Sequence, residues 1–148
     1  MRLLDCTLRD GGYINDWKFG HDTIISIFDR LCEANVDIIE IGFLDDRREY
    51  DPDRTIQPDT ESYRRLFGDI GGRGPMIAAM IDYGTCCIDN IGPCSGSVLD
   101  AIRLIFKKEV YRDALEYAGL LKGKGYKVFL QMVSITSYSD EDMVEFIA

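Results

Sequence analysis

The sequence is poor in the residues that build zinc sites and disulfide frameworks. It has a single histidine, His21, and its five cysteines are odd in number, with no pair separated by two residues. Structural zinc sites and secreted disulfide scaffolds depend on regular Cys and His spacing. We therefore expect reduced thiols in a cytosolic fold, at Cys6, Cys32, Cys86, Cys87 and Cys94.

Basic residues and long apolar runs are also scarce. The 17 Lys and Arg residues are outnumbered by 26 Asp and Glu, giving a formal net charge of -9. This balance argues against a nucleic-acid partner, because affinity for phosphate depends on clustered cations. No stretch approaches the roughly 18 to 20 apolar residues that cross a bilayer, and the N-terminus reads into a strand rather than a signal peptide. We expect a cytoplasmic protein without nucleic-acid or membrane partners.

What the sequence does contain is an alternation of short apolar strands with helical patterns. With 148 residues and 46 % hydrophobic composition, the chain is long enough for one globular core. Apolar spacing predicts helices over residues 24–31, with Asp22 as N-cap, and over 59–67 and 110–121. The expected strands are 2–6, 37–43, 75–81, 101–106 and 127–134.

Apolar strands separated by helices imply a parallel sheet covered by helices. Such a sheet is either doubly wound or a (β/α)₈ barrel, and periodicity does not distinguish the two. Ser139 and Asp142 resemble a capping box that opens a further helix, and the chain stops at Ala148 inside that pattern. We expect the sequence to be the N-terminal part of a longer domain.

Charged residues interrupt the pattern where the first strand ends, in the stretch D-C-T-L-R-D-G-G at residues 5–12. In a barrel this end of a strand lies at the mouth where active sites form. Arg9 and Asp10 would each incur a desolvation cost there unless they were paired or bound to something. A purely structural ion pair remains the alternative.

Glu40 is the second charged residue in an apolar setting. The strand period places it on one face with Ile38 and Gly42, and places Ile39, Ile41 and Phe43 on the other. Because a lone buried Glu is rare, we expect a cationic partner, and Arg9 on the neighbouring strand is the natural one. A structural salt bridge is again the alternative.

Two motifs, D-C-T-L-R-D-G-G at residues 5–12 and I-I-E-I-G-F at residues 38–43, resemble those of the DRE-TIM metallolyases. That family includes 3-hydroxy-3-methylglutaryl-CoA lyase, 2-isopropylmalate synthase, homocitrate synthase and 4-hydroxy-2-oxovalerate aldolase. The longer opening D-G-G-Y-I-N-D-W-K-F looks most like a bacterial branch described as candidate aldolases. The resemblance implies an α/β fold of the TIM (β/α)₈ type, with residues 1–148 as about five parallel βα units of a single catalytic domain.

The resemblance also implies roles for individual residues. Arg9 would polarise the substrate carbonyl or stabilise an enolate, Glu40 would orient Arg9, and Asp10 would bind a divalent metal, Mg²⁺ or Mn²⁺. In that family the remaining metal ligands are an H-x-H pair on the seventh strand, which we would expect beyond residue 148. Tyr13 occupies the position of a catalytic histidine in the aldolases and of a glutamine in CoA-dependent members, so we place it in the catalytic set as a hydrogen-bond donor or acid.

The implied activity is making or breaking a carbon-carbon bond next to the carbonyl of a small 2-oxo acid, with the isolated chain inactive. An acyl-CoA-condensing synthase and a non-catalytic binding or regulatory module derived from a barrel are the alternatives. Arg47 and Arg48 follow the second strand, in a substrate lid or a solvated loop. Arg103, Gln131 and Ser134 are candidates for the barrel interior if the strand register directs them inward.

Overall fold

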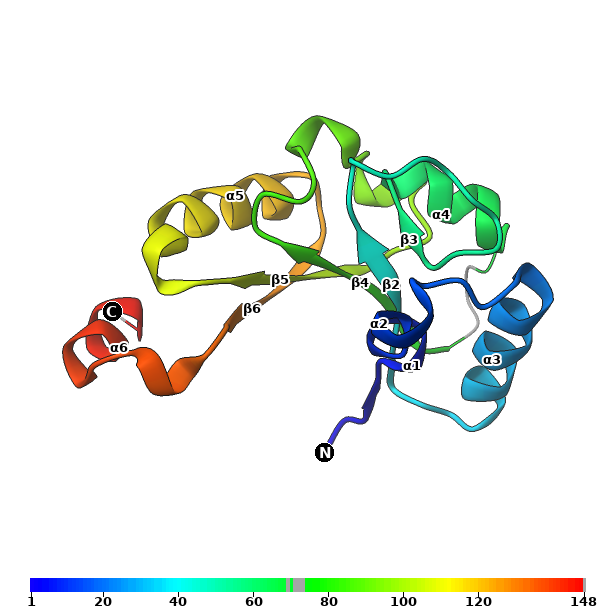
Figure 1. Ribbon diagram of the computed structural model, residues 1–148, viewed down its shortest axis with the longest axis horizontal. Coiled ribbons are helices and arrows are strands. Elements are labelled where there is room, and N and C mark those ends of the chain that lie inside the picture. Colours follow the sequence, from blue (N-terminus) through cyan, green and yellow to red (C-terminus); the bar gives the residue numbers. More distant parts are fainter. Residues whose placement is uncertain (69, 71–73, 148) are drawn as a thin grey trace.

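The computed structural model describes residues 1–68, 70 and 74–147, and consists of parallel strands separated by helices (Figure 1). Among the described residues, no helix is long and apolar enough to cross a membrane. The strands are β1 (Leu4–Asp5), β2 (Ile38–Leu44), β3 (Ile56–Gln57), β4 (Met76–Asp82), β5 (Ala101–Phe106) and β6 (Lys127–Met132). The α-helices are α1 (Thr7–Asp10), α2 (Gly12–Asn15), α3 (His21–Glu33), α4 (Thr60–Phe67), α5 (Tyr111–Gly123) and α6 (Asp140–Ile147).

The strand order decides between the two parallel architectures. The order is β1-β2-β4-β5-β6, and every strand pairing is parallel. The short strand β3 pairs with the last two residues of β2, whereas β1 pairs with the first two. A doubly wound sheet reverses its strand order at a switch point, whereas a barrel adds its strands in chain order. The sheet is therefore a half-barrel of the (β/α)₈ type, as the family resemblance implied. The two-residue strand β3 was not predicted.

The main hydrophobic core lies between the sheet and its helices. The alternate strand residues Ile39, Ile41, Ala79 and Ile102 contact the apolar sides of α3, α4 and α5. On the opposite, inner face, Ile38, Ala78 and Ala101 form a smaller cluster. The inner face also carries the buried charges of the chain's candidate site.

A β-bulge changes the expected alternation on β2. The register shifts between Glu40 and Phe43, so Phe43 joins Trp17 and Met80 in an inner cluster instead of lying with Ile39 and Ile41. Gly42 permits the close approach of a neighbouring segment, because a Cβ there would lie 1.9 Å from the Thr55 carbonyl oxygen. The prediction for Phe43 was wrong because a bulge is not visible in the period of a strand.

The helix starts were predicted in part. The side chain of Asp59 accepts from the Ser62 backbone N–H at 2.6 Å at the start of α4, and Ser139 and Asp142 form the expected capping box. Asp22, however, is not the N-cap of α3. That helix begins at His21 after Gly20, and Asp53 supplies the carboxylate that accepts from the His21 N–H at 3.0 Å.

The two edges of the half-barrel lead us to predict self-association. Strands β1 and β6 lie at the ends of the sheet order, and Leu130 on β6 is 40 % exposed. Unpaired strand edges and uncovered apolar surface favour pairing with another chain. Light scattering over a concentration series should therefore show oligomers. Leu130→Lys should reduce them, and a wild-type chain that stays monomeric at high concentration would contradict the prediction.

Candidate active site

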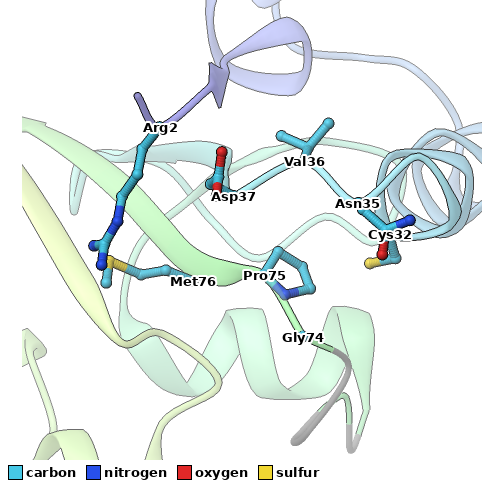
Figure 2. Close-up of a pocket in the computed structure, with 8 residues that line it drawn as sticks. All are labelled: Arg2, Cys32, Asn35, Val36, Asp37, Gly74, Pro75 and Met76. Atoms are coloured by element: carbon cyan, nitrogen blue, oxygen red, sulfur yellow. The ribbon is translucent and has the colours of Figure 1, made fainter.

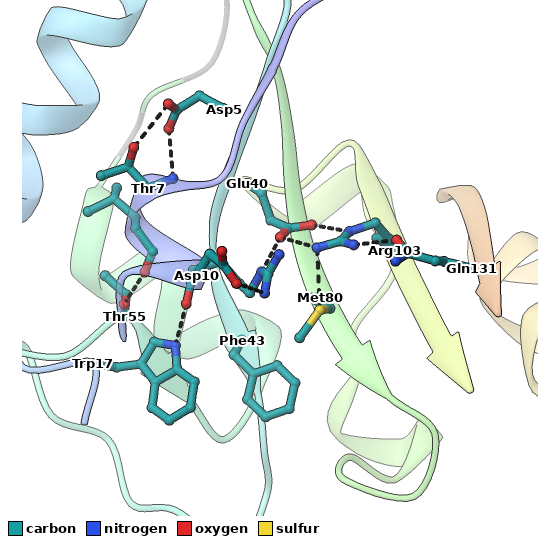
Figure 3. Close-up of polar contacts among 12 residues, drawn as sticks. Asp5, Thr7, Asp10, Trp17, Glu40, Phe43, Thr55, Met80, Arg103 and Gln131 are labelled. Atoms are coloured by element: carbon teal, nitrogen blue, oxygen red, sulfur yellow. Dashed lines mark hydrogen bonds and ion pairs between the residues drawn. The ribbon is translucent and has the colours of Figure 1, made fainter. Parts of the chain in front are cut away.

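Glu40 is the centre of a buried cluster of charges on the inner face. Its side chain is fully buried in β2, and two arginines from different parts of the fold bind it (Figure 3). Arg9 Nε donates to Oε1 at 2.5 Å, while Arg103 on β5 donates from Nη2 to Oε1 and from Nε to Oε2, both at 2.6 Å. The predicted pairing of Arg9 with Glu40 is confirmed.

Arg9 is held on a helical turn that directly follows β1. The Trp17 indole N–H donates to the Arg9 carbonyl at 2.8 Å, and the Thr55 hydroxyl donates to the preceding carbonyl, of Leu8, at 2.6 Å. Burial lowers the pKa of the guanidinium, but the hydrogen bond and the charge of Glu40 outweigh it, so the pKa of Arg9 is raised overall. Arg9 is thus a fixed, permanently charged group.

Trp17 supports this turn from a strained backbone conformation. Its φ of 56° and that of Asp16, 54°, lie in the left-handed region, which costs a bulky residue about 1–3 kcal/mol. The indole stacks on Phe43 with ring centroids 5.7 Å apart, besides its bond to Arg9. Strain of this kind persists only where the surroundings fix it, and it is typical of functional sites.

Gly12 makes room for this indole, and we predict that a side chain there disrupts the turn. A Cβ at Gly12 would lie 2.0 Å from Trp17 Cδ1, so Gly12→Ala should destabilise the chain by about 1–3 kcal/mol. Urea unfolding followed by the fluorescence of Trp17, the single tryptophan, measures the effect. Gly119→Ala, on α5 with open space around it, is the control and should be neutral or stabilising. Equal midpoints for both variants would contradict the prediction.

Asp10 and Tyr13 lie on the open side of the cluster. Asp10 Oδ1 accepts from Arg9 Nη1 at 2.7 Å, and its side chain is 62 % exposed. Tyr13 is 60 % exposed and packs edge-on against Trp17, with ring centroids 4.9 Å apart. The structure thus brings Arg9, Asp10 and Glu40 together, and places Tyr13 beside the turn that carries Arg9 rather than in contact with Glu40.

Arg103 was named in the sequence only as a candidate for the interior, and the structure makes it a full member of the cluster. Its Nη1 also donates to Gln131 on β6, and its Nη2 lies 3.4 Å from Met80 Sδ (Figure 3). The signal in the sequence is the same as for Glu40, one charged residue in an otherwise apolar strand. The register of β5 then decides which way it points.

The remaining residues named in the sequence analysis lie outside this cluster. Arg47 binds Asp45, and Arg48 binds Asp16, which lies between α2 and α3. His21 begins α3, where its Nε2 lies 3.3 Å from the Leu66 carbonyl oxygen. Burial raises the pKa of the Cys86 thiol to about 12, so this group stays protonated at neutral pH. Ser134 follows β6 in the left-handed region, with φ 57°.

The described residues do not form a metal site by themselves. None of them form a group of three or more His, Cys, Asp or Glu side chains that could hold an ion. Asp5, the other carboxylate of the motif, is already bound by the Thr7 backbone N–H at 2.9 Å and hydroxyl at 3.0 Å. Asp10 is thus the carboxylate beside Arg9 that is open to an ion, and oxygen donors of this kind suit Mg²⁺ or Mn²⁺.

A separate cavity of about 360 Å³ lies at the other end of the sheet (Figure 2). It is lined by Arg2, which precedes β1, by Asp37, which precedes β2, and by Met76 at the start of β4. Active sites of parallel barrels form at the carboxyl ends of the strands, and the amino ends serve stability. We therefore assign the candidate site to the charged cluster.

Comparison with known proteins supports the architecture. The structure is similar to a crystal structure described as the N-terminal domain of a putative aldolase from Bacteroides vulgatus, with a TM-score of 0.63 and 22 % sequence identity over 93 % of this chain. The two share a fold. The match covers 46 % of that solved chain, so this chain spans about half its length. No protein-family model and no curated protein matches the sequence.

Proposed function

We propose that this chain is the N-terminal part of a divalent-metal-dependent aldolase or lyase of the DRE-TIM metallolyase type, acting next to the carbonyl of a 2-oxo acid. The observation that supports the proposal is the fixed guanidinium of Arg9. It lies beyond the carboxyl end of β1, held between Glu40 and Asp10. The fold shared with an N-terminal domain described as that of a candidate aldolase is consistent with this proposal.

Arg9 would act on the oxyanion that develops during carbon-carbon cleavage. In a 4-hydroxy-2-oxo acid, a base takes the C4 hydroxyl proton, C4 becomes a carbonyl, and the bond between C3 and C4 breaks. The electron pair of that bond forms the enolate of the 2-oxo acid, which is then protonated at C3. The negative charge grows on the C2 oxygen. A fixed cation at that oxygen stabilises the transition state without reorganisation.

Asp10 and Tyr13 would complete the contribution of this half of the barrel. A bound Mg²⁺ or Mn²⁺ would act as a Lewis acid toward the 2-oxo acid, with Asp10 as one ligand and the others from sequence beyond residue 148. Tyr13 is 60 % exposed beside this turn. It would donate a hydrogen bond or a proton to the substrate, because a phenol carries an O–H donor.

The test is release of a 2-oxo acid from 4-hydroxy-2-oxo acids by the longest natural protein that carries this segment. We expect turnover that requires Mg²⁺ or Mn²⁺ and is lost with a chelator, and little or no turnover by residues 1–148 alone. Condensation of an acyl-CoA with a 2-oxo acid would instead identify a synthase. Absence of both reactions with either metal would contradict the proposal.

A non-catalytic binding module is the second candidate. The observation that favours it is that Glu40 is satisfied by two arginines among the described residues, as a purely structural cluster would be. Calorimetry with 2-oxo acids separates the two candidates. Tight binding without metal or turnover would support the module.

A further inference from the structure

Arg103, rather than Arg9, fixes the plane of the Glu40 carboxylate. Arg9 makes one bond to Glu40, from Nε to Oε1, which leaves the carboxylate free to rotate about that contact. Arg103 makes two hydrogen bonds to Glu40, one to each carboxylate oxygen. Among the described residues, Arg103 is the donor that binds Oε2. A two-point contact between planar groups sets orientation as well as distance.

Arg103 is itself held in place for this contact. Its side chain is 13 % exposed, Gln131 accepts from its Nη1, and Met80 lies against its Nη2. It reaches Glu40 across the intervening strand β4, where Ala78 pairs in register with Glu40 and Met80 with Arg103. Ala78, with only a methyl group, leaves the space beside Glu40 open to the guanidinium.

The contacts form one continuous series across the inner face, from Gln131 on β6 through Arg103 and Glu40 to Arg9 and Asp10 (Figure 3). Its two ends lie on opposite edges of the half-barrel. Arg9 sits at the end of a short β1 strand and a four-residue turn. The orientation of its guanidinium therefore depends on its two side-chain partners, Glu40 and Asp10, and the orientation of Glu40 depends in turn on Arg103.

We propose that Arg103 is a positioning residue that acts through Glu40 to hold Arg9 in the orientation that cleavage of the substrate needs. This inference rests on the proposed function. In this role Arg103 does not contact the substrate. Replacing the planar guanidinium of Arg103 should therefore reduce the rate of the chemical step and leave substrate binding nearly unchanged.

The kinetic test compares Arg103→Lys and Arg103→Met in the longest natural protein with the same substitutions at Arg64, an exposed arginine paired with Glu61. Lysine keeps the positive charge but cannot make the two-point contact of a guanidinium. In Arg103→Lys we therefore expect kcat to fall roughly 10- to 100-fold with little change in KM, as for residues that orient catalytic groups. The Arg64 variants should match the wild type. Unchanged kcat in Arg103→Lys, or a loss confined to KM, would overturn the proposal.

A double substitution tests whether Arg103 acts through Glu40. If it does, Glu40→Gln combined with Arg103→Lys should lower kcat no further than the more damaging single change, because the two residues form one unit. Fully multiplicative losses would overturn the proposal. The lysine variant retains the buried charge, so the test does not depend on Arg103→Met folding.

An NMR measurement separates failure of this inference from failure of the proposed function. In the wild type, Arg9 Nε–H should exchange slowly with solvent because of its bond to Glu40. In Arg103→Lys this exchange should accelerate, while the backbone amides of α5 keep their protection. Slow Arg9 exchange in the variant would overturn the positioning role even if no aldolase activity were found. Fast exchange in a protein without activity would leave that role standing and the proposed reaction wrong.

Discussion

Glu40→Met should lower the free energy of unfolding by about 3–5 kcal/mol, because breaking a buried ion pair from one side leaves uncompensated charge in the interior. Three guanidinium N–H groups, one of Arg9 and two of Arg103, would lose their acceptor at once. Single domains are stable by about 5–15 kcal/mol, so the loss is a large part of the total. The shift of the urea midpoint, at constant slope, measures it.

Two further variants show where this loss comes from. Glu61→Met removes an exposed carboxylate that pairs with Arg64, and its midpoint should scarcely move. The triple change of Glu40, Arg9 and Arg103 to methionine should recover much of the stability, because no charge is left unpaired. If Glu40→Met unfolds at the wild-type midpoint, the buried cluster does not stabilise the fold.

Replacement of Arg9 has the largest expected effect on the proposed reaction. Loss of one fixed donor from an oxyanion site typically lowers kcat by about 100- to 1000-fold. Arg9→Met should therefore reduce kcat on this scale in the longest natural protein. Arg9→Lys should also be impaired, because lysine cannot reproduce the separate bonds from Nε to Glu40 and from Nη1 to Asp10.

The matched control for Arg9 is Arg64→Met, which removes a guanidinium from the surface and should leave kcat unchanged. Steady-state kinetics at saturating metal make the comparison, with circular dichroism to confirm that each variant is folded. Arg9→Met with wild-type kcat would exclude Arg9 from the reaction. A loss in KM alone would show that Arg9 binds the substrate without stabilising the transition state.

The strands and most helices could be predicted because local properties specify them. The apolar strand at residues 101–106 was predicted with the bounds that β5 has, and Asp59 and Ser139 cap the helices that follow them. Failures came where a distant residue supplied the contact. Asp53 caps α3 from 32 residues away, and the Thr55 carbonyl against Gly42 accompanies the bulge that turns Phe43 inward.

By itself, the sequence determined which charged residues needed partners, because a carboxylate or guanidinium in an apolar strand cannot remain unpaired once that strand is buried. It singled out Arg9, Asp10 and Glu40. Only the tertiary structure decided that Arg103, 63 residues beyond Glu40, completes the cluster. That contact depends on the register and curvature of three neighbouring strands, and pairing between strands is a property of the whole sheet rather than of any one segment.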